Sequence, residues 1–62
     1  MSEQPGRFLR LPDVLDRVGL GRTKVYEMIG EGSFPPPIKQ GRLSLWPESR
    51  VVAWQTAVMA AA

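Results

Sequence analysis

The 62-residue sequence contains no cysteine and no histidine, and these two absences exclude several kinds of chemistry. Disulfides and Cys/His metal sites are excluded, so the chain has neither of the staples that domains of this size commonly use. A thiol nucleophile and the Ser–His and Cys–His catalytic pairs are excluded as well. We therefore expect a protein that is not an enzyme and that binds no cofactor or metal.

The sequence also lacks a long hydrophobic run. No apolar stretch approaches the roughly 20 residues of a membrane-spanning helix, and the first residues do not form a signal-peptide core. We therefore expect a cytoplasmic protein without a membrane partner. Its length allows one small domain with a small core. The net charge is only +2, but the stretch from Arg7 to Arg42 holds seven basic and four acidic residues, a balance compatible with a phosphate-bearing partner.

Residues 1–6 show no apolar periodicity and are predicted to be a disordered lead. The domain is expected over residues 7–59, with a frayed tail at 60–62. Pro12 suits the first turn of a helix that Gly19 ends. A second helix is predicted from Arg22 to about Gly30. The apolar faces of these two helices are formed by Val14, Leu15 and Val18 in the first, and by Val25, Met28 and Ile29 in the second.

The second half of the chain begins with a stiff connector of three prolines, residues 35–37. Residues 38–40 and 43–46 then predict two short strands around a Gly41-Arg42 turn. A third helix opens at residues 47–48. Its core-facing stripe is predicted to be Val51, Trp54 and Val58. The expected fold class is therefore mainly α with a small β-hairpin, in the order helix, helix, hairpin, helix.

Three residues, 19–21, separate the first two helices, which is the spacing of a helix-turn-helix. An ordinary helical hairpin is the alternative. The first turn of the second helix holds Arg22 and Lys24, where the helix dipole disfavours cations. A DNA phosphate or a guanine edge would compensate these charges, whereas the simpler interpretation is a solvated basic turn.

Placing the second helix at about 100° per residue turns its apolar face inward and leaves a polar face for the DNA major groove. Arginine suits guanine, threonine a thymine methyl or a phosphate, and glutamate the cytosine amine. The candidate DNA-binding residues on this helix are Arg22, Thr23, Lys24, Tyr26 and Glu27, although Tyr26 is equally suited to packing. The hairpin tip adds Lys39, Gln40 and Arg42, for which a solvated turn is the alternative.

Three motifs occur together along the chain: Gly-Leu-x-Arg-x-x-Val-Tyr at 19–26, Phe-Pro-x-Pro at 34–37 and Trp-x-Glu-Ser at 46–49. With Arg10-Leu11, Val51 and Trp54, they resemble the AlpA family of prophage regulators and the related small excisionases. The resemblance covers about Arg7 to Trp54. The sequence departs from the family at two positions, Gly21 in place of the common serine cap and Val52 in place of a polar residue.

This resemblance implies a winged helix-turn-helix of the MerR-like type that binds double-stranded DNA sequence-specifically in the bacterial cytoplasm, at the nucleoid. It implies a regulator of integrase expression or of excision. By the same likeness, the recognition helix carries Arg22, Thr23, Lys24 and Tyr26, and the wing carries Arg42. The alternative function is a protein-interaction module, such as an anti-repressor, on the same fold. A steep salt dependence of binding would favour DNA.

A second apolar strip is predicted on the third helix, beside its core-facing stripe. Val52 lies about 100° and Met59 about 80° from the centre of that stripe. We expect these two residues to support weak self-association on adjacent DNA sites. An inert surface is the alternative, because single exposed apolar residues are common.

Overall fold

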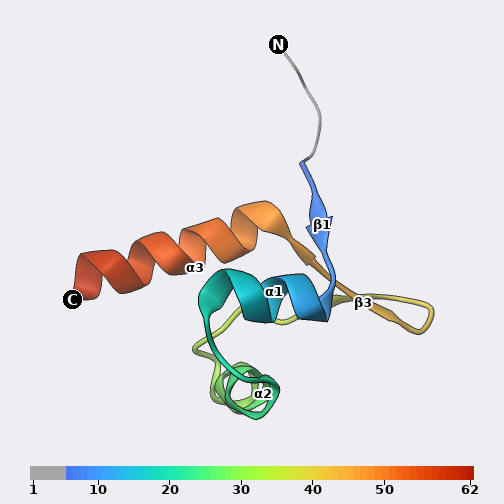
Figure 1. The fold of residues 1–62 in the computed structure, drawn as a ribbon, viewed down its shortest axis with the longest axis horizontal. Coiled ribbons are helices and arrows are strands. Elements are labelled where there is room, and N and C mark those ends of the chain that lie inside the picture. Colours follow the sequence, from blue (N-terminus) through green and yellow to red (C-terminus); the bar gives the residue numbers. More distant parts are fainter. Residues whose placement is uncertain (1–5) are drawn as a thin grey trace.

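The computed structural model describes residues 6–62, so residues 1–5 of the predicted lead lie outside it. It is a mostly helical domain with three helices and a small antiparallel sheet. Figure 1 shows α1 between α2 and α3, with a β-hairpin projecting to one side. Within residues 6–62, no helix is both long enough and apolar enough to cross a membrane. The elements are β1 (Phe8–Leu9), α1 (Leu11–Val18), α2 (Arg22–Glu31), β2 (Ile38–Gln40), β3 (Leu43–Pro47) and α3 (Glu48–Ala61).

Helices α1 and α2 form where the sequence predicts them, and glycine ends both. The Asp13 carboxylate accepts a hydrogen bond from the Arg10 backbone N–H at 3.4 Å, which satisfies one free donor at the start of α1. Gly19 ends α1 in the left-handed conformation at φ 72°. Helix α2 ends at Glu31, one residue beyond the predicted end at about Gly30. Gly32 follows in the left-handed conformation at φ 81°, and its N–H donates to the Ile29 carbonyl.

The sheet has three strands, whereas the sequence predicts only a two-stranded hairpin. Strands β2 and β3 form that hairpin, with Lys39 opposite Ser44 and a turn at residues 41–42. Strand β1 adds to the other edge of β3, with Leu9 opposite Trp46, so the strand order is β1-β3-β2. Two residues are too few to show alternation, so β1 is recognisable only from its partner strand.

The core is built from one fully buried residue in each of six segments. Trp46 is the largest of them and is completely enclosed. Its indole N–H donates to the Pro35 carbonyl at 3.0 Å, so its one polar atom is satisfied. The six buried residues, in chain order from β1 through the loop after α2 to α3, are Leu9, Val14, Val25, Phe34, Trp46 and Val51.

Helix α3 departs from its predicted packing at its C-terminal half. Val51 is buried and Trp54 is half-buried, as the stripe predicts, but Val58 is 48% exposed and lies outside the core. The reason is visible in Figure 1, where the end of α3 extends beyond α1. Periodicity identifies the apolar face of a helix but not how far its packing partner reaches. The segment 60–62, expected to fray, is helical as far as Ala61.

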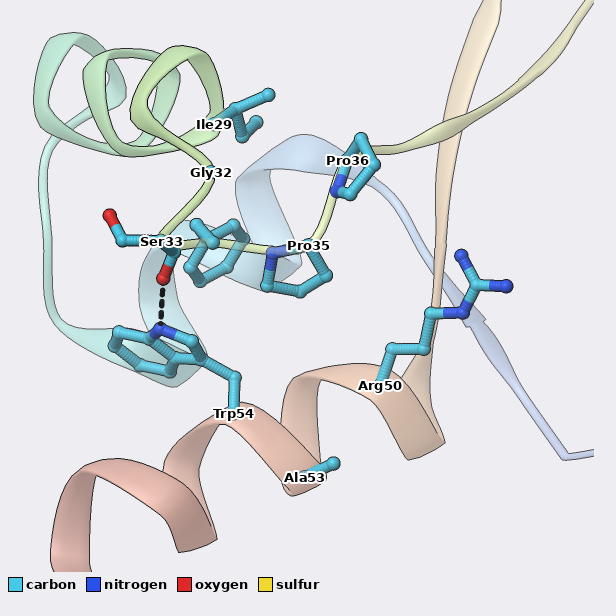
Figure 2. Close-up of a pocket in the computed structure, with 9 residues that line it drawn as sticks. Ile29, Gly32, Ser33, Pro35, Pro36, Arg50, Ala53 and Trp54 are labelled. Atoms are coloured by element: carbon cyan, nitrogen blue, oxygen red, sulfur yellow. Dashed lines mark hydrogen bonds between the residues drawn. The ribbon is translucent and has the colours of Figure 1, made fainter. Parts of the chain in front are cut away.

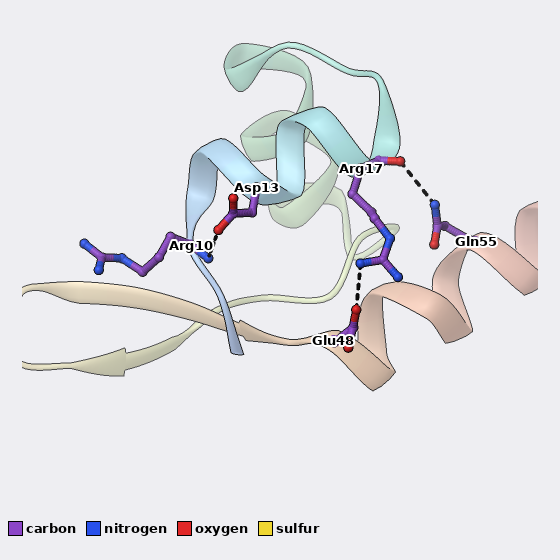
Figure 3. A network of polar contacts seen from close by, with 5 residues as sticks. All are labelled: Arg10, Asp13, Arg17, Glu48 and Gln55. Atoms are coloured by element: carbon purple, nitrogen blue, oxygen red, sulfur yellow. Dashed lines mark hydrogen bonds and ion pairs between the residues drawn. The ribbon is translucent and has the colours of Figure 1, made fainter. Parts of the chain in front are cut away.

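A polar network ties the end of α1 to α3 (Figure 3). The Arg17 guanidinium contacts the Glu48 carboxylate at 2.7 Å, and the Gln55 side-chain amide donates to the Arg17 carbonyl at 3.2 Å. That carbonyl belongs to the last turn of α1 and has no partner within the helix. The network therefore fixes the start of α3 relative to α1.

The Arg17–Glu48 contact makes stability depend on pH. The hydrogen bond from Arg17 lowers the pKa of the Glu48 carboxyl below its ordinary value. A lowered folded-state pKa contributes stability above the unfolded pKa, and that stability is lost as pH falls through the folded pKa. We expect Glu48→Gln to reduce the fall in Tm between about pH 6 and about pH 3. Thermal unfolding by circular dichroism measures it.

The matched control for this prediction is Asp16→Asn, which neutralises an acid on α1 that has no ion-pair partner among residues 6–62. The control is expected to keep the parent's pH dependence. Equal pH dependence of Tm in Glu48→Gln and the parent would contradict the prediction.

Candidate nucleic-acid interface

Helix α2 presents a polar face to solvent, in the orientation that its sequence predicts. Val25 is fully buried, and Met28 and Ile29 are half-buried against the core. Tyr26 is 40% exposed, so it is not a core residue. The remaining candidate residues on this helix are all exposed: Arg22, Thr23, Lys24 and Glu27.

The two cations in the first turn of α2 have different surroundings. The Lys24 ammonium lies 3.8 Å from the Glu27 carboxylate, with both side chains more than half exposed. An exposed pair of this kind contributes little stability, but it gives Lys24 the partner that the sequence did not reveal. Arg22 has no acidic partner within residues 6–62, and the first turn holds no acidic residue. The unfavourable position next to the helix dipole therefore remains uncompensated for Arg22.

The β2–β3 hairpin carries the other three candidate residues. Gly41 adopts φ 61°, which permits the tight turn and places Arg42 beside it at the tip. Gln40 and Arg42 are exposed. The Lys39 ammonium donates to the Ser44 hydroxyl across the hairpin at 2.8 Å, an uncharged partner that leaves its charge unneutralised.

Arg10 is a further cation beside the hairpin, and it is not among the residues that the sequence predicts to bind DNA. It joins β1 to α1, and its guanidinium extends along the hairpin, away from Asp13 (Figure 3). Among residues 6–62 it has no ion-pair partner. In the sequence, only its place in the Arg10-Leu11 motif could have marked Arg10 as a candidate. The pairing of β1 with β3 is what brings it beside the hairpin.

The structure also contains an open apolar groove of about 520 Å³ between α3 and the loop that follows α2 (Figure 2). Trp54 forms part of its wall, packs edge-on against Phe34 with ring centroids 4.9 Å apart, and donates to the Ser33 carbonyl at 2.8 Å. Among residues 6–62, no acidic side chain lines the groove. Its lining residues are Ile29, Gly32, Ser33, Phe34, Pro35, Pro36, Arg50, Ala53 and Trp54.

Comparison with known proteins assigns the chain to a family. Residues 7–59 match the family model described as the prophage CP4-57 regulatory protein, AlpA. The uncharacterized protein ORF88 of Enterobacteria phage P4 is 45% identical over 49 residues. That alignment covers 77% of this chain and 56% of the phage protein, so the chain spans little more than half of this curated relative. No solved structure gives a significant match. Since the family match covers most of the chain, the protein belongs to the AlpA family of prophage regulatory proteins.

Proposed function

We propose that this protein is a sequence-specific DNA-binding regulator of prophage or mobile-element genes, acting on integrase expression or on excision. In this proposal α1, the turn at 19–21 and α2 form a helix-turn-helix, with α2 as the recognition helix. The β2–β3 hairpin is its wing, in a winged helix-turn-helix of the MerR-like type. Family membership supports regulation through DNA, and the partner is double-stranded DNA.

The observation that carries this proposal is the state of Arg22. Its guanidinium is exposed at the first position of α2, unneutralised by any acid within residues 6–62, where the helix dipole opposes it. A local rule that is broken without compensation within the protein is typical of a functional position, where a ligand compensates it. A guanine edge offers two acceptors that match the guanidinium fork, and a phosphate offers opposite charge.

The candidate residues divide into two groups by the DNA chemistry that each side chain suits. On α2, Arg22, Thr23 and Glu27 are proposed to contact base edges in the major groove, and Lys24 and Tyr26 to contact the backbone beside them. Glu27 exchanges its weak contact with Lys24 for a cytosine amine in this arrangement. The proposed backbone contacts outside α2 are Arg10, Lys39, Gln40 and Arg42.

The test is selection of bound duplexes from a random-sequence library with the purified protein, followed by titration of the best duplex and of random DNA at several salt concentrations. We expect an enriched sequence and a steep fall of affinity with salt. A protein-interaction module such as an anti-repressor is the competing function, and it predicts no enriched sequence. Selected sites at an integrase promoter favour transcriptional regulation, whereas sites beside an attachment sequence favour a role in excision.

Arg42→Ala tests the wing. Because Arg42 is proposed to contact a phosphate, its loss should weaken binding to the selected and to the random duplex equally. The slope of log affinity against log salt should fall by about one unit. Titration of both duplexes at several salt concentrations measures both effects.

The matched control for Arg42→Ala is Arg50→Ala, which removes an exposed arginine from α3 at the groove, outside the proposed interface. The control should keep the parent's salt slope. A parent-like slope in Arg42→Ala would exclude Arg42 from the interface.

A further inference from the structure

Helix α3 carries large apolar side chains that the core does not cover, most of them in its C-terminal half. It extends beyond α1 in Figure 1, and no charged residue follows Arg50. Met59 is 76% exposed, Val58 48% and Val52 42%, which makes these three the large apolar residues of α3 that the core leaves open. Within residues 6–62, no other segment buries these three side chains, so they are available to another molecule.

Two of these exposed residues form a seam along the helix. Val52 and Met59 are seven residues apart, which places them within about 20° of one another on the helix surface and about 10 Å apart along its axis. Gln55 and Thr56 lie between them. Gln55 already donates to the Arg17 carbonyl, which holds this part of α3 against α1 and fixes the direction in which the seam faces.

We infer that the seam binds the same seam of a second copy, with the two α3 helices antiparallel. Such a pair is two-fold symmetric about a point between Gln55 and Thr56, so Val52 of each copy lies opposite Met59 of the other. The seam carries no charge, so a partner with charged side chains would leave them unpaired on apolar surface. A second copy supplies an uncharged apolar seam of the same length.

The small size of the seam determines when the copies associate. The surface that two apolar side chains and their neighbours on each copy can bury is well below the about 1,200 Å² of a stable interface. The copies therefore remain apart in free solution and associate where adjacent DNA sites hold them close, which raises their effective concentration. This step rests on the proposed DNA-binding function. The two-fold symmetry further predicts that the two sites are inverted relative to one another.

The experiment uses the duplex selected from the random library, as one site and as two inverted sites. The spacing between the two sites is varied over one helical turn of about 10 base pairs. Band-shift titration measures cooperativity, the ratio of second-site to first-site affinity. We expect at least about tenfold cooperativity at one favoured spacing for the parent. Val52→Glu and Met59→Lys should each abolish it, because each places a charge against an apolar residue of the other copy.

The double variant Val52→Glu/Met59→Lys should restore cooperativity, because the antiparallel arrangement brings each new glutamate opposite the partner's new lysine. Ala57→Glu is the matched control, since it adds the same charge to an exposed position about 150° around the helix from the seam. It should keep the parent's cooperativity.

Independent filling of the two sites by the parent at every spacing would overturn the inference, as would unchanged cooperativity in the single variants. Failure of the double variant to recover cooperativity would overturn the antiparallel pairing. If the parent protein does not bind the one-site duplex at all, the proposed DNA-binding function is wrong. That outcome is distinct from binding without cooperativity, which contradicts only the self-association.

Discussion

Trp46→Ala is expected to unfold the domain. The side chain is completely enclosed among the other five core residues, and its indole N–H satisfies the Pro35 carbonyl. Truncating a buried tryptophan costs about 3–5 kcal/mol, because the cavity left behind does not close. A single core in a chain of this size supplies about the same amount, so nothing remains to hold the fold. Circular dichroism during heating measures the loss of the cooperative transition.

Tyr26→Ala provides the control for this prediction, since it removes a large aromatic side chain that is 40% exposed and outside the core. We expect it to unfold cooperatively near the parent's temperature. A cooperative transition for Trp46→Ala at that same temperature would show that the core does not depend on the indole.

Trp54→Ala should be less damaging than Trp46→Ala, although Trp54 belongs to the predicted core-facing stripe of α3. Trp54 is only half-buried and lies at the wall of the open groove. Its loss removes the edge-on contact with Phe34 and the hydrogen bond to Ser33, yet leaves the central core filled. The variant should stay folded with a lower Tm.

Arg22→Ala is expected to reduce discrimination between the selected and random duplexes by about 1–3 kcal/mol, a factor of about 5 to 150 in relative affinity. The guanidinium is exposed at the first position of α2 and unpaired within residues 6–62, so it is free to form a bidentate contact with guanine. Thr23→Ala should act in the same direction with a smaller effect. Competition titrations with both duplexes at one salt concentration provide the measurement.

Arg22→Lys separates a base contact from a charge effect. Lysine keeps the positive charge but lacks the planar fork, so random-duplex affinity should stay near the parent's while discrimination falls. If Arg22→Ala weakens both duplexes equally, Arg22 contacts the backbone and another α2 residue specifies the base.

The orientation of the α2 surface was easier to predict from the sequence than the contacts of the side chains on it. Surface orientation on α2 depends on helical periodicity alone, and Val25, Met28 and Ile29 point inward as expected. The partners of the surface charges could not be predicted from periodicity. The contact of Lys24 with Glu27 and that of Lys39 with Ser44 depend on side-chain conformation, which sequence spacing permits but does not select.

The local structure of this protein follows from short-range patterns in its sequence. Glycine at 19 and 41, proline at 35–37 and apolar spacing set the helices and the hairpin, because each acts over a few neighbouring residues. Features that depend on distant partners required the whole fold. Strand β1 exists through its pairing with β3, and the exposure of Val58 follows from where α1 ends. A short-range pattern shows which face of an element is apolar, but the rest of the fold determines whether anything covers that face.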